Sequence, residues 1–214
     1  MNRLAGHVPH WLSAVVLVLI GGVTYTAFYQ PILFSDDWSY LVMPMAQQSI
    51  NWFSVADRRP LVNAPVALLH SLIGLNIDGL YVIAWLITLA IAWQLYWVLQ
   101  RLLPLRLRYV ALLVAALTLV FPADLSQMWL THTVLGRVAW LLTLVAMSAL
   151  LTFVERHHYG YLVVATLLAV IAPLMYEAAL GVLLGLCVLL AIWKRALWVL
   201  LPAGLNVAYM LWRS

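Results

Sequence analysis

Residues 79–100 read GLYVIAWLITLAIAWQLYWVLQ, a run of uncharged residues long enough to cross a membrane. A helix needs about 20 consecutive, mostly apolar residues to span the hydrocarbon core of a bilayer. The run is followed by a basic cluster formed by Arg101, Arg106 and Arg108. This combination predicts a transmembrane helix whose carboxyl end lies at the cytoplasmic surface.

The composition extends this prediction to the whole chain. Of its 214 residues, 66% are hydrophobic and 8% are charged, whereas soluble domains carry about 25% charged residues. We therefore expect an all-α fold, a polytopic transmembrane helix bundle of about seven crossings, in which residues 1–214 form a single transmembrane domain. The basic residues behind the net charge of +4 are scattered in short loops rather than gathered on one face, so no nucleic-acid partner is expected.

Further apolar runs predict the other crossings, at about residues 10–29, 107–122, 136–154, 160–175, 178–193 and 197–212. The apolar stretch from Tyr161 to Ile192 is too long for one crossing, since its length as a helix would be about 48 Å against a core of about 30 Å. Pro173 and Glu177 therefore mark a tight turn inside it. The first run continues to Phe28 without a small-residue cleavage site, which indicates a retained anchor rather than a signal peptide.

The charges of the loops predict the orientation of the bundle. With a cytoplasmic amino terminus and seven crossings, the inner loops hold seven basic residues and one acid, and the outer loops hold four basic residues and six acids. An excess of lysine and arginine on the inner side is the bias that membrane insertion enforces. We therefore expect a multi-pass protein of the cell (inner) membrane with its amino terminus in the cytoplasm.

The segment Leu61–Gly74 is apolar but only 14 residues long. If it crossed the membrane, the basic cluster at 101–108 would face outward, against the charge bias. We expect it to lie on the outer surface, in the interface or dipping partly into it. Residues 30–78 then form one outer loop between the first crossing, within 1–29, and six further crossings within 79–214.

Two juxtamembrane helices are expected in this outer loop. In the first, apolar residues recur at helical spacing and so share one face; these are Trp38, Leu41, Val42 and Met45. The second begins at Pro60, because proline is favoured at the first helical position, and ends near Gly74. These two helices would hold the acidic residues of the loop at the level of the lipid headgroups.

Asp36 and Asp37 lie at the start of the first juxtamembrane helix, and two interpretations fit them. Ser35 can be the N-cap, with both acids complementing the helix dipole. Alternatively, a carboxylate beside the membrane can deprotonate an acceptor hydroxyl or hold a divalent cation on a phosphate. Adjacent helical residues point about 100° apart, so we expect one carboxylate to face the site and the other to face a partner or solvent.

Arg58, Arg59 and Arg137 are basic residues on the outer side, against the inward bias. An arginine pair near carboxylates suits the recognition of a phosphate by bidentate hydrogen bonds, and Arg137 is similar at the outer end of the fourth crossing. The alternatives are rim contacts with anionic headgroups for Arg58 and Arg59, and snorkelling for Arg137.

Glu177 and His132 are further candidate residues of the outer side. A single acid in so apolar a stretch is costly, so Glu177 is expected to face the polar outer loop, unless it caps the helix that follows it. His132 lies in the second outer stretch, Ala123–Thr133.

The stretch Phe34-Ser35-Asp36-Asp37-Trp38-Ser39-Tyr40 resembles the acidic motif of the GT-C superfamily of polyprenyl-phosphate-sugar glycosyltransferases. Members of that superfamily include protein O-mannosyltransferases and the bacterial aminoarabinose transferases that modify lipid A. The stretch from Arg58-Arg59-Pro60-Leu61 to Leu72-Ile73-Gly74-Leu75-Asn76 is similar in position and pattern to a later element of the superfamily. The resemblance covers essentially the whole chain, and its motifs are short and degenerate.

The resemblance implies an inverting transfer of a sugar from a polyprenyl-phosphate-linked donor to an acceptor at the outer face, among membrane lipids. Asp36 or Asp37 would be the general base, and Arg58 or Arg59 would contact the lipid phosphate. Some members use a divalent cation and others do not, and Asp36 and Asp37 are the ligands available for one. The further residues expected to bind substrate are Arg137, Glu177, His132 and Tyr40.

Superfamily members usually continue past the seventh crossing into more helices and often a soluble outer domain, whereas this sequence stops at Ser214. The chain is then a shortened relative, a fragment, or half of a two-chain enzyme whose partner subunit supplies the carboxyl-terminal domain. Two other functions compete with glycosyl transfer: a transporter or flippase for a lipid-linked sugar, and a non-catalytic membrane scaffold. Transporters usually place ionisable groups near the midplane, and the acids here lie at the outer edge, which favours an enzyme.

Overall fold

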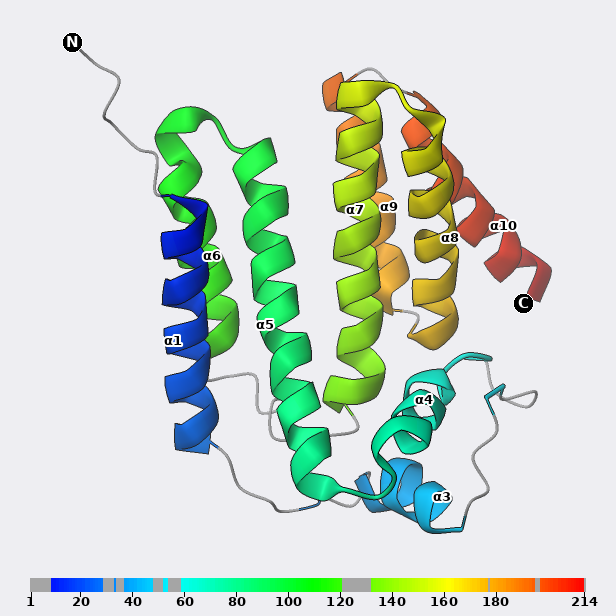
Figure 1. Ribbon diagram of the computed structural model, residues 1–214. Helices are drawn as coiled ribbons and strands as arrows, with labels where there is room; N and C mark the ends of the chain where they lie inside the picture. Colours follow the sequence, from blue (N-terminus) through cyan, green and yellow to red (C-terminus); the bar gives the residue numbers. More distant parts are fainter. Residues whose placement is uncertain are drawn as a thin grey trace.

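The computed structural model describes residues 9–28, 33, 37–47, 52–53, 59–120, 132–176, 178–194 and 197–213. Within these ranges every regular element is a helix and there is no strand, which confirms the all-α prediction (Figure 1). The elements follow in the order α1 (His10–Phe28), η1 (Trp38–Val42), α3 (Met43–Ala46), α4 (Ala64–Ile73), α5 (Ile77–Leu102), η2 (Leu105–Leu107), α6 (Arg108–Val120), η4 (His132–Arg137), α7 (Val138–Arg156), α8 (Tyr159–Met175), α9 (Ala178–Lys194), η5 (Leu197–Leu200) and α10 (Leu201–Arg213).

From α1 to α9 the long helices agree with the ranges expected from hydropathy to within two residues at each described end. The last one begins four residues later than expected, because Leu197–Leu200 forms the 3-10 helix η5 before α10. By length and apolar composition, three of the described helices can cross a membrane: His10–Ala27 of α1, Ile77–Leu102 of α5 and Val138–Arg156 of α7. The turn expected after residue 175 is present, because α8 ends at Met175 and α9 begins at Ala178. Pro173 does not end α8 but lies inside its last turn.

Large apolar side chains lie exposed on the outside of the helices, the reverse of a water-soluble fold. Trp11 and Val23 on α1 are each 69% exposed, and α6 and α8 expose leucines and valines in the same way. A surface this apolar is stable against lipid rather than water. The coarse prediction of a membrane helix bundle therefore agrees with the packing as well as with the composition.

The helices form two packed groups (Figure 1). In the first group, α1 and α6 pack on α5 around the buried Tyr96, whose hydroxyl accepts a hydrogen bond from the Ser13 hydroxyl at 3.1 Å. Gly21 of α1 allows a close approach to α5, since a Cβ at this position would lie 2.5 Å from the side chain of Leu89, which would have to shift. The second group comprises α7, α8, α9 and α10, whose shared core includes Met147, Ala165 and the buried Cys187.

A row of polar contacts, here called the seam, joins the two groups along α5 and α7. At one end of the seam the Arg137 guanidinium donates to the Thr88 hydroxyl at 2.9 Å. In the middle the Ser148 hydroxyl donates to the Gln94 side-chain oxygen at 3.2 Å. In lipid, apolar side chains gain no hydrophobic free energy by packing against one another, so hydrogen bonds between helices contribute to holding them together.

Arg101 forms the opposite end of the seam. Its guanidinium pairs with both carboxylate oxygens of Glu155, at 3.2 and 2.7 Å, and also donates to the Ser148 carbonyl and the Thr152 hydroxyl, both at 3.0 Å. The Arg101 side chain is 21% exposed and that of Glu155 is 51% exposed. Arg101 is therefore bonded to α7 in two ways: by part-buried hydrogen bonds to Ser148 and Thr152, and by an exposed ion pair with Glu155.

The first juxtamembrane segment is helical, but its apolar face differs in part from the prediction. Leu41, Val42 and Met45 are buried as expected, against α4 and the start of α5, whereas Trp38 is 52% exposed. The reason is that Trp38–Val42 forms a π-helical turn rather than an α-helical one. The wider i→i+5 turn rotates Trp38 away from the face that the later residues share.

The second juxtamembrane helix begins later than expected. Pro60 lies in a turn, and α4 begins at Ala64 with Pro65 in its first turn. The Leu61 amide donates to the Leu174 carbonyl of α8, and this bond holds the chain out of the helix. The helix ends as predicted at Gly74, which has a positive φ of 61°. At ten residues, α4 is about 15 Å long and is too short to cross a core of about 30 Å.

Replacing Arg101 tests the seam. Arg101→Met removes the bonds to Ser148, Thr152 and Glu155, and we expect it to destabilise the protein by about 1–3 kcal/mol. Glu155→Gln removes only the exposed ion pair and should cost less than about 1 kcal/mol. Thermal unfolding in detergent would measure both changes, with the exposed Arg106→Gln as the control. If Glu155→Gln destabilises the protein as much as Arg101→Met does, the bonds from Arg101 to Ser148 and Thr152 do not contribute more stability than the exposed ion pair.

Candidate functional site

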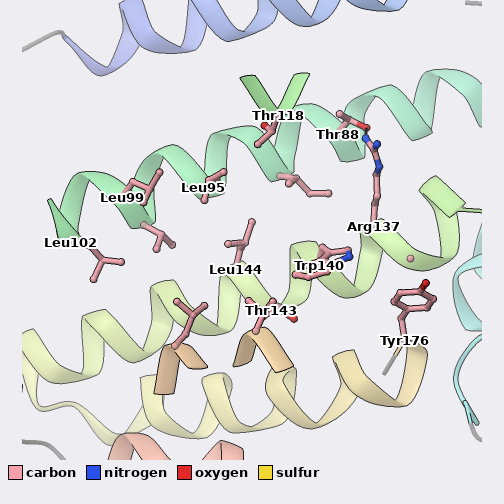
Figure 2. Close-up of a pocket in the computed structure, with 15 residues that line it drawn as sticks. Thr88, Leu95, Leu99, Leu102, Thr118, Arg137, Trp140, Thr143, Leu144 and Tyr176 are labelled. Carbon is pink, nitrogen blue, oxygen red and sulfur yellow. Dashed lines mark hydrogen bonds between the residues drawn. The ribbon is translucent and has the colours of Figure 1, made fainter. Parts of the chain in front are cut away.

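A crevice of about 590 Å³ lies between the two helix groups. Figure 2 shows it running beside α5, with Leu102 at one end and Arg137 and Tyr176 at the other. Its walls come from α5, α6, α7 and α9, with the end of α8 at the mouth. The lining residues are Thr88, Ile91, Leu95, Val98, Leu99, Leu102, Thr118, Gly136, Arg137, Trp140, Thr143, Leu144, Tyr176, Val182 and Leu186.

The long wall of the crevice is one apolar face of α5. Thr88, Leu95 and Leu102 recur every seven residues, which places them on the same side of an α-helix. The span from Thr88 to Leu102 corresponds to about 21 Å of helix. On the opposite wall, Leu144 of α7 and Leu186 of α9 are also apolar. The crevice is therefore a narrow apolar slot along most of its length.

Arg137 provides the charge among the residues that line this crevice. It is 9% exposed and lies at the end of the π-helical turn η4, just before α7 begins. Of the two interpretations from the sequence, snorkelling would direct the guanidinium outward to the headgroups, but here it reaches across to Thr88 on α5. The result is a cation held at the mouth of an apolar slot (Figure 2).

Arg59 reaches the same mouth through Tyr176. The Arg59 guanidinium carbon lies 4.8 Å from the centre of the Tyr176 ring, in a cation–π contact, and Tyr176 also lines the crevice. The nearby bond between the Leu61 amide and the Leu174 carbonyl fixes the Arg59 segment on the end of α8. Two residues proposed from the sequence to recognise phosphate, Arg59 and Arg137, thus flank one tyrosine.

Asp37 lies near the amino-terminal end of α5 and is fully buried, with 0% exposure. It is close enough to Tyr81 for an electrostatic interaction between the two side chains. Tyr81 and Thr88 are seven residues apart on α5, so they share a face about 10 Å apart along the axis. Asp37 and Arg137 are therefore arranged along one face of α5, with the carboxylate nearer the amino-terminal end.

The remaining candidates stay predictions. Asp36, Arg58 and Glu177 lie outside the described residues, as do the side chains of Tyr40 and His132, whose backbones belong to η1 and η4. Among the described residues, no three His, Cys, Asp or Glu side chains come together to hold a metal ion. Of Asp36 and Asp37, the two residues named as available ligands for a divalent cation, the structure describes Asp37 alone.

Of the residues that line the crevice, sequence reasoning named Arg137 alone; those it missed include Thr88, Trp140 and Tyr176. Thr88 carried a usable signal, because it is a hydroxyl side chain within the uncharged run 79–100, and polar side chains inside a membrane helix usually meet a partner on another helix. Trp140 and Tyr176 carried no such signal, since aromatic residues near helix ends are equally explained as interface anchors.

No protein-family model, curated protein or solved structure matches this chain. The chemistry of the site must therefore be inferred from its geometry. A narrow apolar slot with a guanidinium at its mouth fits an amphiphile that has a single long apolar chain and an anionic head.

The contact between Arg59 and Tyr176 can be tested by hydrogen exchange. Tyr176→Leu removes the cation–π attraction, worth about 0.5–1 kcal/mol at a partly exposed site, so the Leu61 amide should exchange about two- to five-fold faster. Tyr176→Phe keeps the aromatic face and should leave the exchange rate unchanged. If Tyr176→Phe accelerates exchange as much as Tyr176→Leu does, the tyrosine hydroxyl rather than the ring face holds the segment.

Proposed function

We propose that this chain is the membrane module of a GT-C-type glycosyltransferase that uses a polyprenyl-phosphate-linked sugar and transfers the sugar at the outer face of the membrane. The observation that carries the proposal is the apolar crevice with Arg137 at its mouth. The outer-loop acid Asp37 lies further out along the same face of α5. These features supply a place for the lipid chain, a cation for the phosphate and a carboxylate beyond it.

The length of the crevice favours a polyprenyl chain over an ordinary phospholipid. One leaflet is about 15 Å deep, half of a hydrocarbon core of about 30 Å. The lining residues extend along about 21 Å of α5, from Thr88 to Leu102. A polyprenyl chain is a single long hydrocarbon that can follow a slot of this length, whereas each acyl chain of a phospholipid needs only the depth of one leaflet.

The proposed reaction assigns a role to each side of the site. Asp37, or Asp36 beside it, takes the proton of an acceptor hydroxyl as that oxygen attacks the anomeric carbon of the sugar. The bond between the anomeric carbon and the phosphate oxygen breaks, and its electron pair leaves with the polyprenyl phosphate. Arg137 and Arg59 stabilise the charge that develops on this phosphate. The configuration at the anomeric carbon is inverted.

The arrangement of the helices is compatible with seven crossings and a cytoplasmic amino terminus. The helices α1 and α5–α10 alternate in direction along the chain, and α3 and α4 lie together at one end (Figure 1). The opposite end carries Arg101, Arg106 and Arg156, which suits the cytoplasmic side. Of these helices, α8 and α9 have 17 residues each, at the lower limit for spanning a bilayer. The described lengths of α6 and α10, 13 residues each, are below that limit.

Lipid binding tests the headgroup site. Native mass spectrometry of the detergent-purified protein with equal amounts of a polyprenyl phosphate and the matching neutral polyprenol should show a preference for the phosphate. Arg137→Met should lower this preference about tenfold or more, the order expected when a hydrogen-bonded charge pair is lost.

The neutral polyprenol is the internal control for this measurement. Its binding should survive in Arg137→Met, because the apolar slot is unchanged. Equal binding of phosphate and alcohol by the unmodified protein would overturn the proposed headgroup site, and with it the assignment of a polyprenyl phosphate as donor.

Complementation tests the catalytic role of the buried carboxylate. A strain that lacks this protein should lose a sugar from its cell envelope, which mass spectrometry of the envelope glycans would detect. Asp37→Asn should fail to restore the sugar while it accumulates in the membrane at the normal level, because the amide cannot accept the proton. The matched control is Asp78→Asn, an exposed acid at the start of α5, which should restore the sugar. Full restoration by both Asp37→Asn and Asp36→Asn would exclude the proposed base.

A further inference from the structure

Thr88 and Arg137 form a directional hydrogen-bond chain at the mouth of the crevice. The Thr88 hydroxyl donates to the Ala84 carbonyl at 2.9 Å, one turn earlier in α5. The same oxygen accepts from the Nη1 of Arg137, also at 2.9 Å. The two residues lie on different helix groups, so the chain bridges the mouth from α5 to the start of α7 (Figure 2).

We infer that Thr88 is a positioning residue that holds the Arg137 guanidinium across the mouth of the crevice and so confers selectivity for a phosphate headgroup. This inference rests on the proposed function, because it assumes that the ligand carries a phosphate. It goes beyond that function in naming a residue, hidden in the uncharged stretch of α5, on which recognition of the donor depends.

The geometry of the hydroxyl explains why threonine suits this position. A hydroxyl has one donor hydrogen and two acceptor lone pairs. Since the hydrogen of Thr88 is used on the Ala84 carbonyl, its lone pairs are directed outward, and only a donor such as arginine can approach them. The bond therefore selects one orientation of a long side chain that otherwise has many rotamers.

The neutrality of the partner matters as much as its position. A carboxylate at residue 88 would also bind Arg137, but it would neutralise the positive charge and compete with an incoming phosphate. A hydroxyl fixes the guanidinium and adds no charge of its own to the mouth. This reasoning predicts that Thr88→Ser keeps the preference for phosphate, that Thr88→Val weakens it, and that Thr88→Asp is the most damaging of the three substitutions.

The test compares lipid selectivity among substitutions at residue 88 in the full chain. Native mass spectrometry with a polyprenyl phosphate and the matching polyprenol gives the ratio of the two bound forms. Thr88→Val should reduce the preference for phosphate about tenfold, the order expected for one hydrogen bond to a charged group. Thr88→Ser should retain the preference to within about twofold, and Thr88→Asp should abolish it.

Binding of the neutral polyprenol separates positioning from a merely structural role. If Thr88→Val lowers the binding of both lipids equally, Thr88 acts on the fold of the crevice and the inference fails. Thr24→Val in α1 is the matched control, since Thr24 is buried and its hydroxyl also donates to a carbonyl one turn earlier, that of Ile20 at 2.8 Å. It should leave the ratio unchanged.

The outcomes distinguish this inference from the proposed function. If Arg137→Met loses the preference but Thr88→Val keeps it, Thr88 does not position the guanidinium, while the headgroup site stands. If the unmodified protein shows no preference for the phosphate, the proposed function itself fails. If Thr88→Val is too unstable to purify, the Thr88→Ser and Thr88→Asp variants decide, since a preference for phosphate that persists with aspartate would overturn the inference.

Discussion

Hydrogen bonds between polar side chains hold α5 against α7, and the rest of the molecule is arranged around that contact. In hydrocarbon, apolar helices gain little by leaving the solvent, so close packing and interhelical hydrogen bonds must hold them together. The seam joins α1, α5 and α6 to α7–α10 at its two ends and in its middle. The crevice lies between the same two groups, so the bonds that set their separation also set its width and the shape of its mouth.

Much of the fold was predictable because hydropathy and charge act locally along the chain. A helix in lipid must satisfy its own backbone and show an apolar surface, so the ranges of α1 and α5–α10 could be predicted from residue type. The two errors between residues 30 and 78 have different causes. Trp38 is exposed because Trp38–Val42 forms a π-helical turn, and Pro60 lies outside the helix because the Leu61 amide bonds to Leu174 in a distant segment.

The candidate site was predictable only where charge is unusual. Arg59 and Arg137 were identified because basic residues are rare on the outer side, and the structure brings them to opposite sides of Tyr176. The crevice could not be predicted from the sequence, since leucines that line a crevice and leucines that face lipid follow the same sequence pattern. Asp37 illustrates the same limit: its place in the sequence suggested a helix cap or a catalytic group, and its complete burial beside Tyr81 is a tertiary property.

The depth of the crevice has a kinetic consequence for the proposed enzyme. A chain that lies along about 21 Å of α5 must slide out over that whole distance before the slot is free. The carrier left behind after transfer has the same hydrocarbon chain as the fresh donor, so the two would compete for the slot with similar residence times. Exchange of spent for loaded carrier with the surrounding bilayer, rather than cleavage at the sugar, would then set the turnover number.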